Sequence, residues 1–347
     1  MWQVLGHEPI IKQLDRSLKE GRYAHAYLLV GPPRVGKRTL ALNLAQAVNC
    51  LSQEDAPFGS AQGRPCGECI QCRRIASAQH ADVVIIGVQR GEGDGPSRKE
   101  IGIDDVREVQ HRASLKPYEG RHRVFIFDGA EHMSEEAANA LLKTLEEPPP
   151  QVLIILLTSR EETLLPTIRS RCWRLEMRPL PLAEVARELV NNHPINTTEA
   201  EQLARLSMGC LGWALSVLKD PSIMERRTEQ LERIAQLSEA SLEDQFNYAS
   251  NLASVFFRDR EGAREVLYMW LRWWRDLLLL REGAGEYIYN VDWEDTLRPM
   301  TSRLTTAQVV GFIRAILRTL EALEHNANAR LALEVLMLNL PGGRIKA

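Results

Sequence analysis

The clearest chemical motif in the sequence is a glycine-rich loop within residues 25–50. Gly31, Gly36 and Lys37 fit the spacing G-x-x-x-x-G-K, with an apolar run before them and helical spacing after them. Such a loop aims backbone N–H groups at phosphates, while the lysine reaches the β and γ oxygens. The next residue is normally Ser or Thr, whose hydroxyl binds Mg²⁺, but here it is Arg38. The motif predicts a P-loop fold with an altered metal position.

Arg38 leaves two interpretations of this loop open. A guanidinium only donates hydrogen bonds and stays charged, so it cannot bind Mg²⁺. Thr39 lies one residue after the position of the metal-binding hydroxyl. On a helix, one residue turns the side chain roughly 100° from that position. Arg38 is therefore either a solvated helix residue in a site that has lost its metal function, or part of a site that holds nucleotide without productive Mg²⁺.

The apolar run RVFIFD at 123–128 supplies the second half of a nucleotide site. A strand that ends in Asp128 matches the strand whose aspartate supports Mg²⁺ in P-loop proteins. In P-loop ATPases of the AAA+ kind, a glutamate follows that aspartate and positions the attacking water. Here the following residue is Gly129, and Glu131 is expected to face elsewhere. The sequence therefore lacks the carboxylate that activates water.

Four cysteines have the spacing of metal ligands. Cys66, Cys69 and Cys72 form C-x-x-C-x-x-C, and Cys50 lies upstream at the end of the helix that follows the loop. Four thiolates are a complete tetrahedral zinc set, with bonds of about 2.3 Å and no open position for catalysis. Four free buried thiols and an iron–sulfur cluster are the alternatives, and both fit this polar segment less well. The spacing predicts structural zinc.

The elements that position these residues follow from apolar periodicity. Continuous apolar runs at 26–30, 82–86, 123–127 and 152–157 alternate with helical segments, which is typical of a parallel sheet covered on both faces. After about residue 178 no convincing strand remains. The predicted domains are an α/β domain, a small helical unit and an all-α region, with the cysteine module inserted in the first at about 50–72. Their bounds are 1–178, 179–220 and 221–347.

Bulk properties narrow the class further. A chain of 347 residues has room for two or three domains. Its net charge of −3 argues against a protein that coats nucleic acid by itself. The first residues do not read as a secretory signal, and no apolar run is long enough to span a membrane, so a cytoplasmic protein is expected. The tryptophans at 270, 273 and 274 have the spacing of a helix face, which is more often core than site.

Longer motifs resemble those of the bacterial clamp-loader family, the AAA+ subunits that load the sliding clamp of the DNA polymerase III holoenzyme. The resemblance covers essentially the whole chain and includes the cysteine module directly after the P-loop helix. It implies an AAA+ P-loop domain with a parallel sheet, a small helical lid and an all-α collar that joins subunits into a ring. The motifs that carry it are HAYLLVGPPRVGKRTLA (25–41), SEEAANALLKTLEEPP (134–149), TIRSRC (167–172) and NANARLALEVLML (326–338).

Three departures from the family's motor subunits point to one branch of the family. The gamma/tau motors carry Lys-Thr or Lys-Ser, Asp-Glu and an arginine in the lid. Here Arg38, Gly129 and Gly212 stand at those places. All three changes remove side chains that the motors use to hydrolyse ATP. The match is therefore closer to the delta-prime branch, whose subunit is a stator that is usually poor or inactive as an ATPase. The resemblance implies that binding of ATP or ADP in the chain's own site is weak or absent.

The resemblance also assigns a role to the arginine of the motif SRC. Arg171 follows a short helix, where it is expected to reach a neighbouring subunit's γ-phosphate as an arginine finger, with Arg169 a less favoured candidate. Thr158 occupies the position that lines the phosphate pocket in the family. The implied partners are the gamma/tau and delta subunits, with the sliding clamp and primed DNA reached through the complex.

Two rival functions make different predictions. A catalytically active gamma/tau-type ATPase would turn over ATP with Mg²⁺ as an isolated chain. A zinc-bearing DNA-binding module unrelated to clamp loading would bind DNA tightly by itself, which the net charge disfavours. Lys116, Arg121 and Arg123 are candidates to face DNA, although such charges more often mark a solvated surface.

Overall fold

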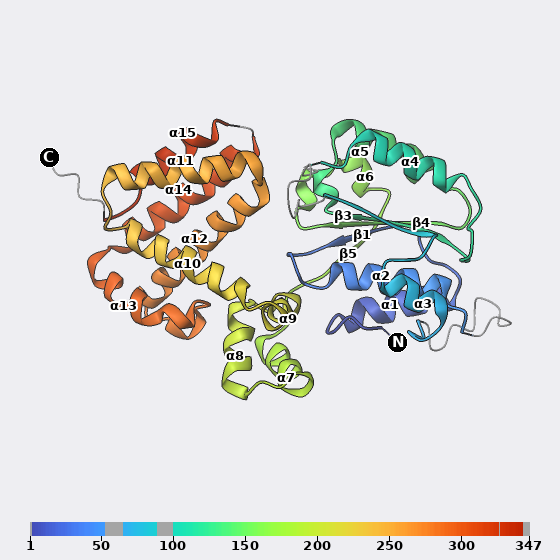
Figure 1. Cartoon of the computed structure of the whole chain (residues 1–347), viewed down its shortest axis with the longest axis horizontal. Helices are drawn as coiled ribbons and strands as arrows, with labels where there is room; N and C mark the ends of the chain where they lie inside the picture. The colour runs from blue at the N-terminus through green and yellow to red at the C-terminus, as the bar shows by residue number, and fades with distance from the viewer. Residues whose placement is uncertain (1, 53–64, 89–99, 326, 343–347) are drawn as a thin grey trace. The chain divides into compact units, whose positions relative to one another are not determined.

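The computed structural model describes residues 2–52, 65–88, 100–325 and 327–342, and the chain divides into two compact units (Figure 1). The first unit comprises Met1–Leu180 with Cys210–Gly212, and the second comprises Pro181–Gly209 with Trp213–Ala347. The loop, the cysteines and Arg171 all belong to the first unit.

The first unit is built on a five-stranded sheet in the order β2-β3-β4-β1-β5. All neighbouring strands pair in parallel, as the continuous apolar runs predict. The register sets Val30 beside Thr158 and Asp128 beside Leu157, which brings the ends of three strands to one edge. The strands are β1 (Ala26–Val30), β2 (Val83–Gly87), β3 (Arg123–Asp128), β4 (Val152–Thr158) and β5 (Trp173–Glu176).

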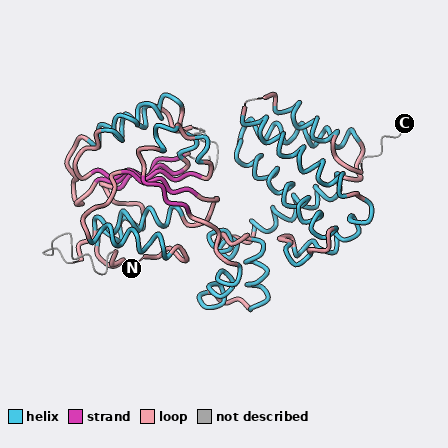
Figure 2. The backbone as a smooth tube through the Cα atoms, turned by 180° about the vertical axis from the view of Figure 1, so that it is seen from behind, coloured by secondary structure: helices cyan, strands magenta, loops and turns pink. Residues whose placement is uncertain are grey.

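Helices cover both faces of this sheet (Figure 2). One face carries α1 (Glu8–Lys19), α2 (Lys37–Asn49) and α3 (Ile70–Ala76), and the other carries α4 (Ile103–Ala113), α5 (Glu135–Glu146) and α6 (Pro166–Arg169). The short helical turns η2 (Ala130–His132) and η3 (Glu161–Thr163) precede α5 and α6. The predicted α/β fold with a parallel sheet is confirmed.

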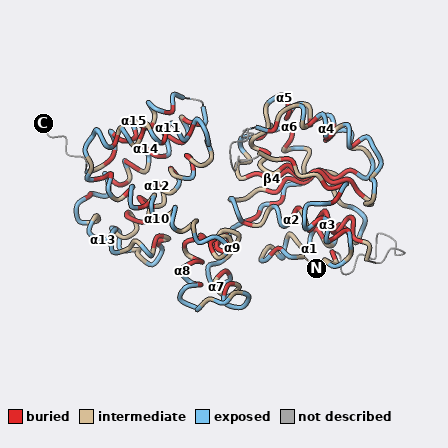
Figure 3. Tube along the Cα trace, in the orientation of Figure 1, coloured by how far each residue is buried: buried red, intermediate tan, exposed pale blue. Residues whose placement is uncertain are grey.

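The described part of the second unit consists of helices and contains no strand. Figure 3 shows buried segments along α12 (Arg260–Arg281) and α14 (Thr306–Glu324). The apolar core of this unit includes Trp270, Trp273 and Trp274, each at most 1% exposed, and the Trp274 ring lies 4.6 Å from that of Phe312. The tryptophan face is therefore core. The helices are α7 (Leu182–Asn192), α8 (Thr197–Leu206), α9 (Leu211–Lys219, which starts in the first unit), α10 (Ser222–Leu237), α11 (Leu242–Arg258), α12 (Arg260–Arg281), α13 (Glu294–Arg303), α14 (Thr306–Glu324) and α15 (Ala329–Leu338), with short turns η4 (Gly285–Tyr287) and η5 (Val291–Trp293).

In the ranges that the structure describes, no helix is both long and apolar enough to cross a membrane.

Candidate functional site

The glycine-rich loop connects β1 to α2, as the motif predicts. A Cβ on Gly31 would lie 2.3 Å from the Met177 carbonyl oxygen, and Gly36 has a φ of 113°, so both positions require glycine. The ammonium of Lys37 donates to the carbonyl oxygens of Gly31 and Pro32. Burial lowers the pKa of Lys37, although nearby carboxylates oppose the shift. The lysine thus bonds to its own loop.

Arg38 forms an ion pair across the place where a P-loop protein holds Mg²⁺. Its Nη1 lies 3.2 Å from Oδ2 of Asp128, the aspartate that ends β3. Both side chains are partly exposed, at 56% and 36%. Arg38 is therefore solvated and also neutralises the carboxylate that would support the metal. Thr39 lies exposed on α2 and offers no hydroxyl to this pair among the described hydrogen bonds.

Glycine is required at both places where the motor subunits carry catalytic side chains. Gly129 has a φ of 86°, and a Cβ there would lie 2.9 Å from the His132 ring. The N–H of Gly212 donates to the Arg34 carbonyl oxygen at 3.1 Å, and a Cβ on Gly212 would lie 2.5 Å from that oxygen. A glutamate at the first position or an arginine at the second would therefore strain or displace the backbone.

The expectation that Glu131 faces away from the site is wrong. The left-handed Gly129 begins turn η2, which directs Glu131 back to the end of β4. Its Oε1 accepts hydrogen bonds from the backbone N–H and the hydroxyl of Ser159, at 3.0 and 2.6 Å. Burial alone would raise the pKa of Glu131, but hydrogen bonds from Ser159 and Thr158 outweigh it and lower the pKa. The Asp-Gly dipeptide at 128–129 was the only sequence signal for this turn.

Thr158 lies at the end of β4, where the sequence places it. Its side chain is buried, and its hydroxyl oxygen accepts a hydrogen bond from the Arg160 N–H at 3.0 Å. The residue therefore fixes the backbone after β4 and also contacts Glu131.

Arg171 lies just beyond α6 and is held by its own chain. Its Nη2 pairs with Oε1 of Glu146 at 2.7 Å, and its Nη1 donates to the Thr167 carbonyl oxygen at 3.0 Å. The side chains of Arg171 and Glu146 are 35% and 50% exposed. In contrast, Nε of Arg169 is buried and has no hydrogen-bond partner in the described structure. Both arginines are half-buried, and the Arg171 guanidinium is the one that pairs with a partly exposed carboxylate.

The four predicted cysteines come together at the ends of two helices. Cys50 follows α2, Cys69 precedes α3 and Cys72 lies in its first turn. The sulfur atoms of all four lie within 4.8 Å of one another, and those of Cys66 and Cys72 are 3.9 Å apart. Tetrahedral bonds of about 2.3 Å separate ligand sulfurs by about 3.8 Å. The four thiols therefore fit one metal ion, and structural zinc is compatible with them.

Arg123 is not a surface residue that faces DNA. It is 9% exposed, pairs with Asp82 at 3.2 Å and donates to the carbonyl oxygens of Arg112 and Lys116. Its charge serves to hold the connection between α4 and β3.

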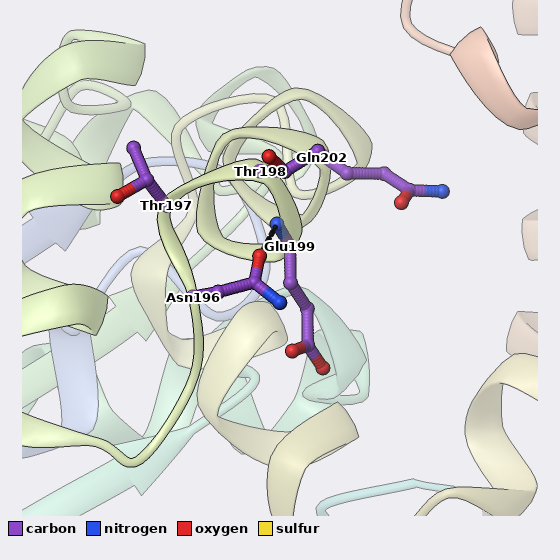
Figure 4. Close-up of a pocket in the computed structure, with 5 residues that line it drawn as sticks. All are labelled: Asn196, Thr197, Thr198, Glu199 and Gln202. Carbon is purple, nitrogen blue, oxygen red and sulfur yellow. Dashed lines mark hydrogen bonds between the residues drawn. The ribbon is translucent and has the colours of Figure 1, made fainter.

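A shallow depression of about 620 Å³ lies at the start of α8 (Figure 4). Here Oδ1 of Asn196 accepts a hydrogen bond from the Glu199 N–H at 2.8 Å, which caps the helix. The Asn196 side chain in this depression thus serves the fold.

The strand order, the loop after β1 and the aspartate at the end of β3 define a P-loop protein of the AAA+ class. Comparisons with known proteins narrow the class. The family model described as DNA polymerase III, delta subunit, matches residues 6–181, and the model of its C-terminal part matches residues 222–341. The chain belongs to this DNA polymerase III delta-subunit family, and is a clamp-loader protein related to delta′ and to gamma/tau.

Individual relatives differ in how much of their length is matched. DNA polymerase III subunit delta′ of Bacillus subtilis is 28% identical over 96% of both chains. Subunit tau/gamma of Haemophilus influenzae is 29% identical over 87% of this chain, which spans only 40% of that relative. A solved gamma subunit-related protein of Thermotoga maritima is 21% identical, with a TM-score of 0.39 and coverage of 94% of this chain and 97% of that one.

Proposed function

We propose that the chain is a delta-prime-like stator of the DNA polymerase III clamp loader, which helps load the sliding clamp onto primed DNA. The observation that carries this proposal is the state of its own nucleotide site. Arg38 neutralises Asp128, and the backbones of Gly129 and Gly212 accept no side chain without strain. Mg²⁺ support, water activation and the lid arginine are absent together, so a nucleotide bound here would not be hydrolysed.

Arg171 then acts on a neighbouring subunit's nucleotide as a trans arginine finger. An exposed ion pair such as Arg171–Glu146 contributes at most about 1 kcal/mol. Arg171 can therefore exchange this carboxylate for a phosphate at little cost. Its planar fork suits phosphate oxygens, which favours arginine over lysine at this place.

The helical part supplies the surfaces for assembly with gamma/tau and delta. We assign 1–178 to the AAA+ domain, 179–220 to the lid and 221–347 to the collar. On α15, Leu331, Val335 and Leu338 are 60%, 48% and 62% exposed and recur on one helix face. An exposed apolar stripe of this kind fits a contact with a partner helix. Such a replication subunit would work in the cytoplasm.

The test of the finger is Arg171→Ala in the reconstituted complex. Loss of an arginine finger typically lowers the rate of phosphoryl transfer by about 10³-fold or more, so DNA-stimulated ATPase and clamp loading should both collapse. Arg171→Lys keeps the charge without the fork and should restore only part of the rate. Arg178→Ala is the control, because Arg178 is 81% exposed. Unchanged ATPase in Arg171→Ala complexes of normal composition would refute the finger, and motor-like turnover by the lone chain would refute the stator.

We also propose that the four cysteines hold one structural Zn²⁺, with no part in catalysis. Elemental analysis of the purified chain should give one zinc per chain. Cys66→Ser should lower this value and the melting temperature, because a structural zinc site contributes directly to folding. Cys172→Ser is the matched control, since Cys172 lies outside the cluster. A folded chain with well under one zinc would contradict the assignment.

A further inference from the structure

One face of α2 carries two buried side-chain amides and leads to the first of the four cysteines. Asn43 and Gln46 lie on the helix and are 1% and 2% exposed, and Cys50 follows the helix and is fully buried. Their spacing of three and then four residues places them on the same side of the helix. Burial of an amide costs free energy unless its donor and acceptor groups are paired, so both amides need partners on other segments.

The two amides form a continuous series of hydrogen bonds, which we call the amide chain. Nε2 of Gln46 donates to the carbonyl oxygen of Cys72 at 2.7 Å, and Oε1 of Gln46 accepts from Nδ2 of Asn43 at 3.0 Å. Oδ1 of Asn43 in turn accepts from the backbone N–H groups of Gln3 and Val4, at 2.6 and 3.3 Å. The amide chain therefore joins the cysteine cluster to the segment that precedes α1.

The groups at its two ends determine how both amides of the chain are oriented. The backbone N–H groups at one end can only donate, and the Cys72 carbonyl oxygen at the other end can only accept. Each amide must therefore turn its oxygen toward the N-terminal segment and its nitrogen toward the cysteines. An aliphatic side chain of similar size in place of Gln46 would remove both of its links, and would leave Nδ2 of Asn43 without its acceptor.

The N-terminal end of the amide chain lies against the glycine-rich loop. Val4 is 7% exposed, and a Cβ on Gly36 would lie 3.2 Å from Cγ2 of Val4. Nε2 of His7 lies 3.4 Å from the carbonyl oxygen of Val35, which belongs to the same loop. Segment 3–7 therefore connects the amide chain to the loop.

We propose that Asn43 and Gln46 are positioning residues that couple the cysteine metal site to segment 3–7, so that a bound Zn²⁺ holds this segment against the loop. This role requires the zinc site proposed above. The four thiols come together from the end of α2 and the segment that begins α3, and the Gln46–Cys72 hydrogen bond joins the same two helices. Such coupling is reciprocal. If the amide chain favours zinc binding, zinc must stabilise the hydrogen bonds of segment 3–7 by the same factor.

The first test measures the zinc affinity of the full chain by competition with a chromophoric chelator. Gln46→Met keeps a side chain of similar size without the amide, and should weaken zinc binding by about tenfold or more, the usual effect of losing a group that orients a metal ligand. Gln245→Met is the matched control, because Gln245 is also buried and donates to the carbonyl oxygen of Leu237, but lies in the second unit. Equal zinc affinity of the native and Gln46→Met chains, or an equal loss in the control, would overturn the proposal.

The second test follows amide hydrogen exchange by NMR in the native chain, with zinc and after its removal with EDTA. The N–H of Val4 should exchange about fivefold faster or more without zinc, the factor that corresponds to the net contribution of one hydrogen bond. Gln46→Met should accelerate the same N–H with zinc bound. The N–H of Ser159 is the internal control, because it also donates to a side-chain oxygen within the first unit but lies outside the amide chain.

Unchanged exchange at Val4 after zinc removal, or equal acceleration at Ser159, would overturn the coupling. This arm of the test uses the native chain, so it remains decisive if Gln46→Met does not fold. A chain with well under one zinc would contradict the zinc assignment itself and this role with it. A chain with one zinc and unaltered Val4 exchange would refute only the role of the amide chain.

Discussion

Two charged regions of the first unit differ in how completely their charges are satisfied. In the nucleotide loop, Lys37 bonds to carbonyl oxygens of its own loop and Arg38 pairs with Asp128. Beside α6, Arg171 remains about one-third exposed and Oε2 of Glu131 has no donor in the described structure. The loop therefore retains the shape of a nucleotide site whose charges are already paired. Beside α6, Arg171 pairs with Glu146 on the neighbouring helix, so it must leave that carboxylate before it can bind another molecule.

The largest stability effect should come from adding one methyl group at Gly212, which lies in α9 and contacts the glycine-rich loop. A Cβ at Gly212 would lie 2.5 Å from the Arg34 carbonyl oxygen, so Gly212→Ala should lower the free energy of unfolding by about 1–3 kcal/mol. Gly311→Ala is the matched control, because Gly311 also lies in a helix and has nothing within 4 Å. It should be neutral or stabilise by up to about 1 kcal/mol. Urea denaturation measures both, and equal midpoints would show that Gly212 does not constrain the loop.

A smaller effect should appear in the pH dependence of stability, which tests Glu131. Because the fold lowers the pKa of Glu131, its contribution is fully present above the unfolded value of about 4.3. It is lost as the pH falls through the lower, folded value. The Glu131→Gln chain should therefore lose less stability than the native chain between pH 6 and pH 3 in urea denaturation. An equal loss in both chains would mean that Glu131 is not held as a carboxylate.

The smallest effects should distinguish the two exposed ion pairs. Arg38→Ala and Glu146→Gln each remove one partner, and each should change stability by at most about 1 kcal/mol. In the reconstituted complex, Glu146→Gln frees Arg171 and should raise the ATPase by up to about fivefold, the factor that 1 kcal/mol allows. Arg38→Ala should leave that rate unchanged. A comparable change in both variants would remove the distinction between the two regions.

Much of the fold could be predicted because its signals are local. Continuous apolar runs mark strands buried on both faces, and β1, β3 and β4 lie where those runs predict. The cysteine spacing brought four thiols together because three of them lie within one short segment that begins α3. The three departures at Arg38, Gly129 and Gly212 were also visible in the sequence.

Contacts between distant segments could not be predicted. The burial of Arg123 depends on Asp82, which lies before another strand. The orientation of Glu131 depends on a left-handed glycine and on Ser159 beyond β4. The amide chain joins three segments that no periodicity relates to one another.

The sequence by itself determined which elements form, which residues end them and that Arg38, Gly129 and Gly212 stand where the family resemblance expects other side chains, because these are properties of residue type and spacing. Only the tertiary structure decided that the Gly212 backbone contacts the carbonyl oxygen of Arg34 and that Arg38 pairs with Asp128. It also decided that Oε2 of Glu131 is buried without a donor in the described structure. Each of these depends on where parallel strands and helices bring distant backbones, and that geometry is set by packing over the whole unit.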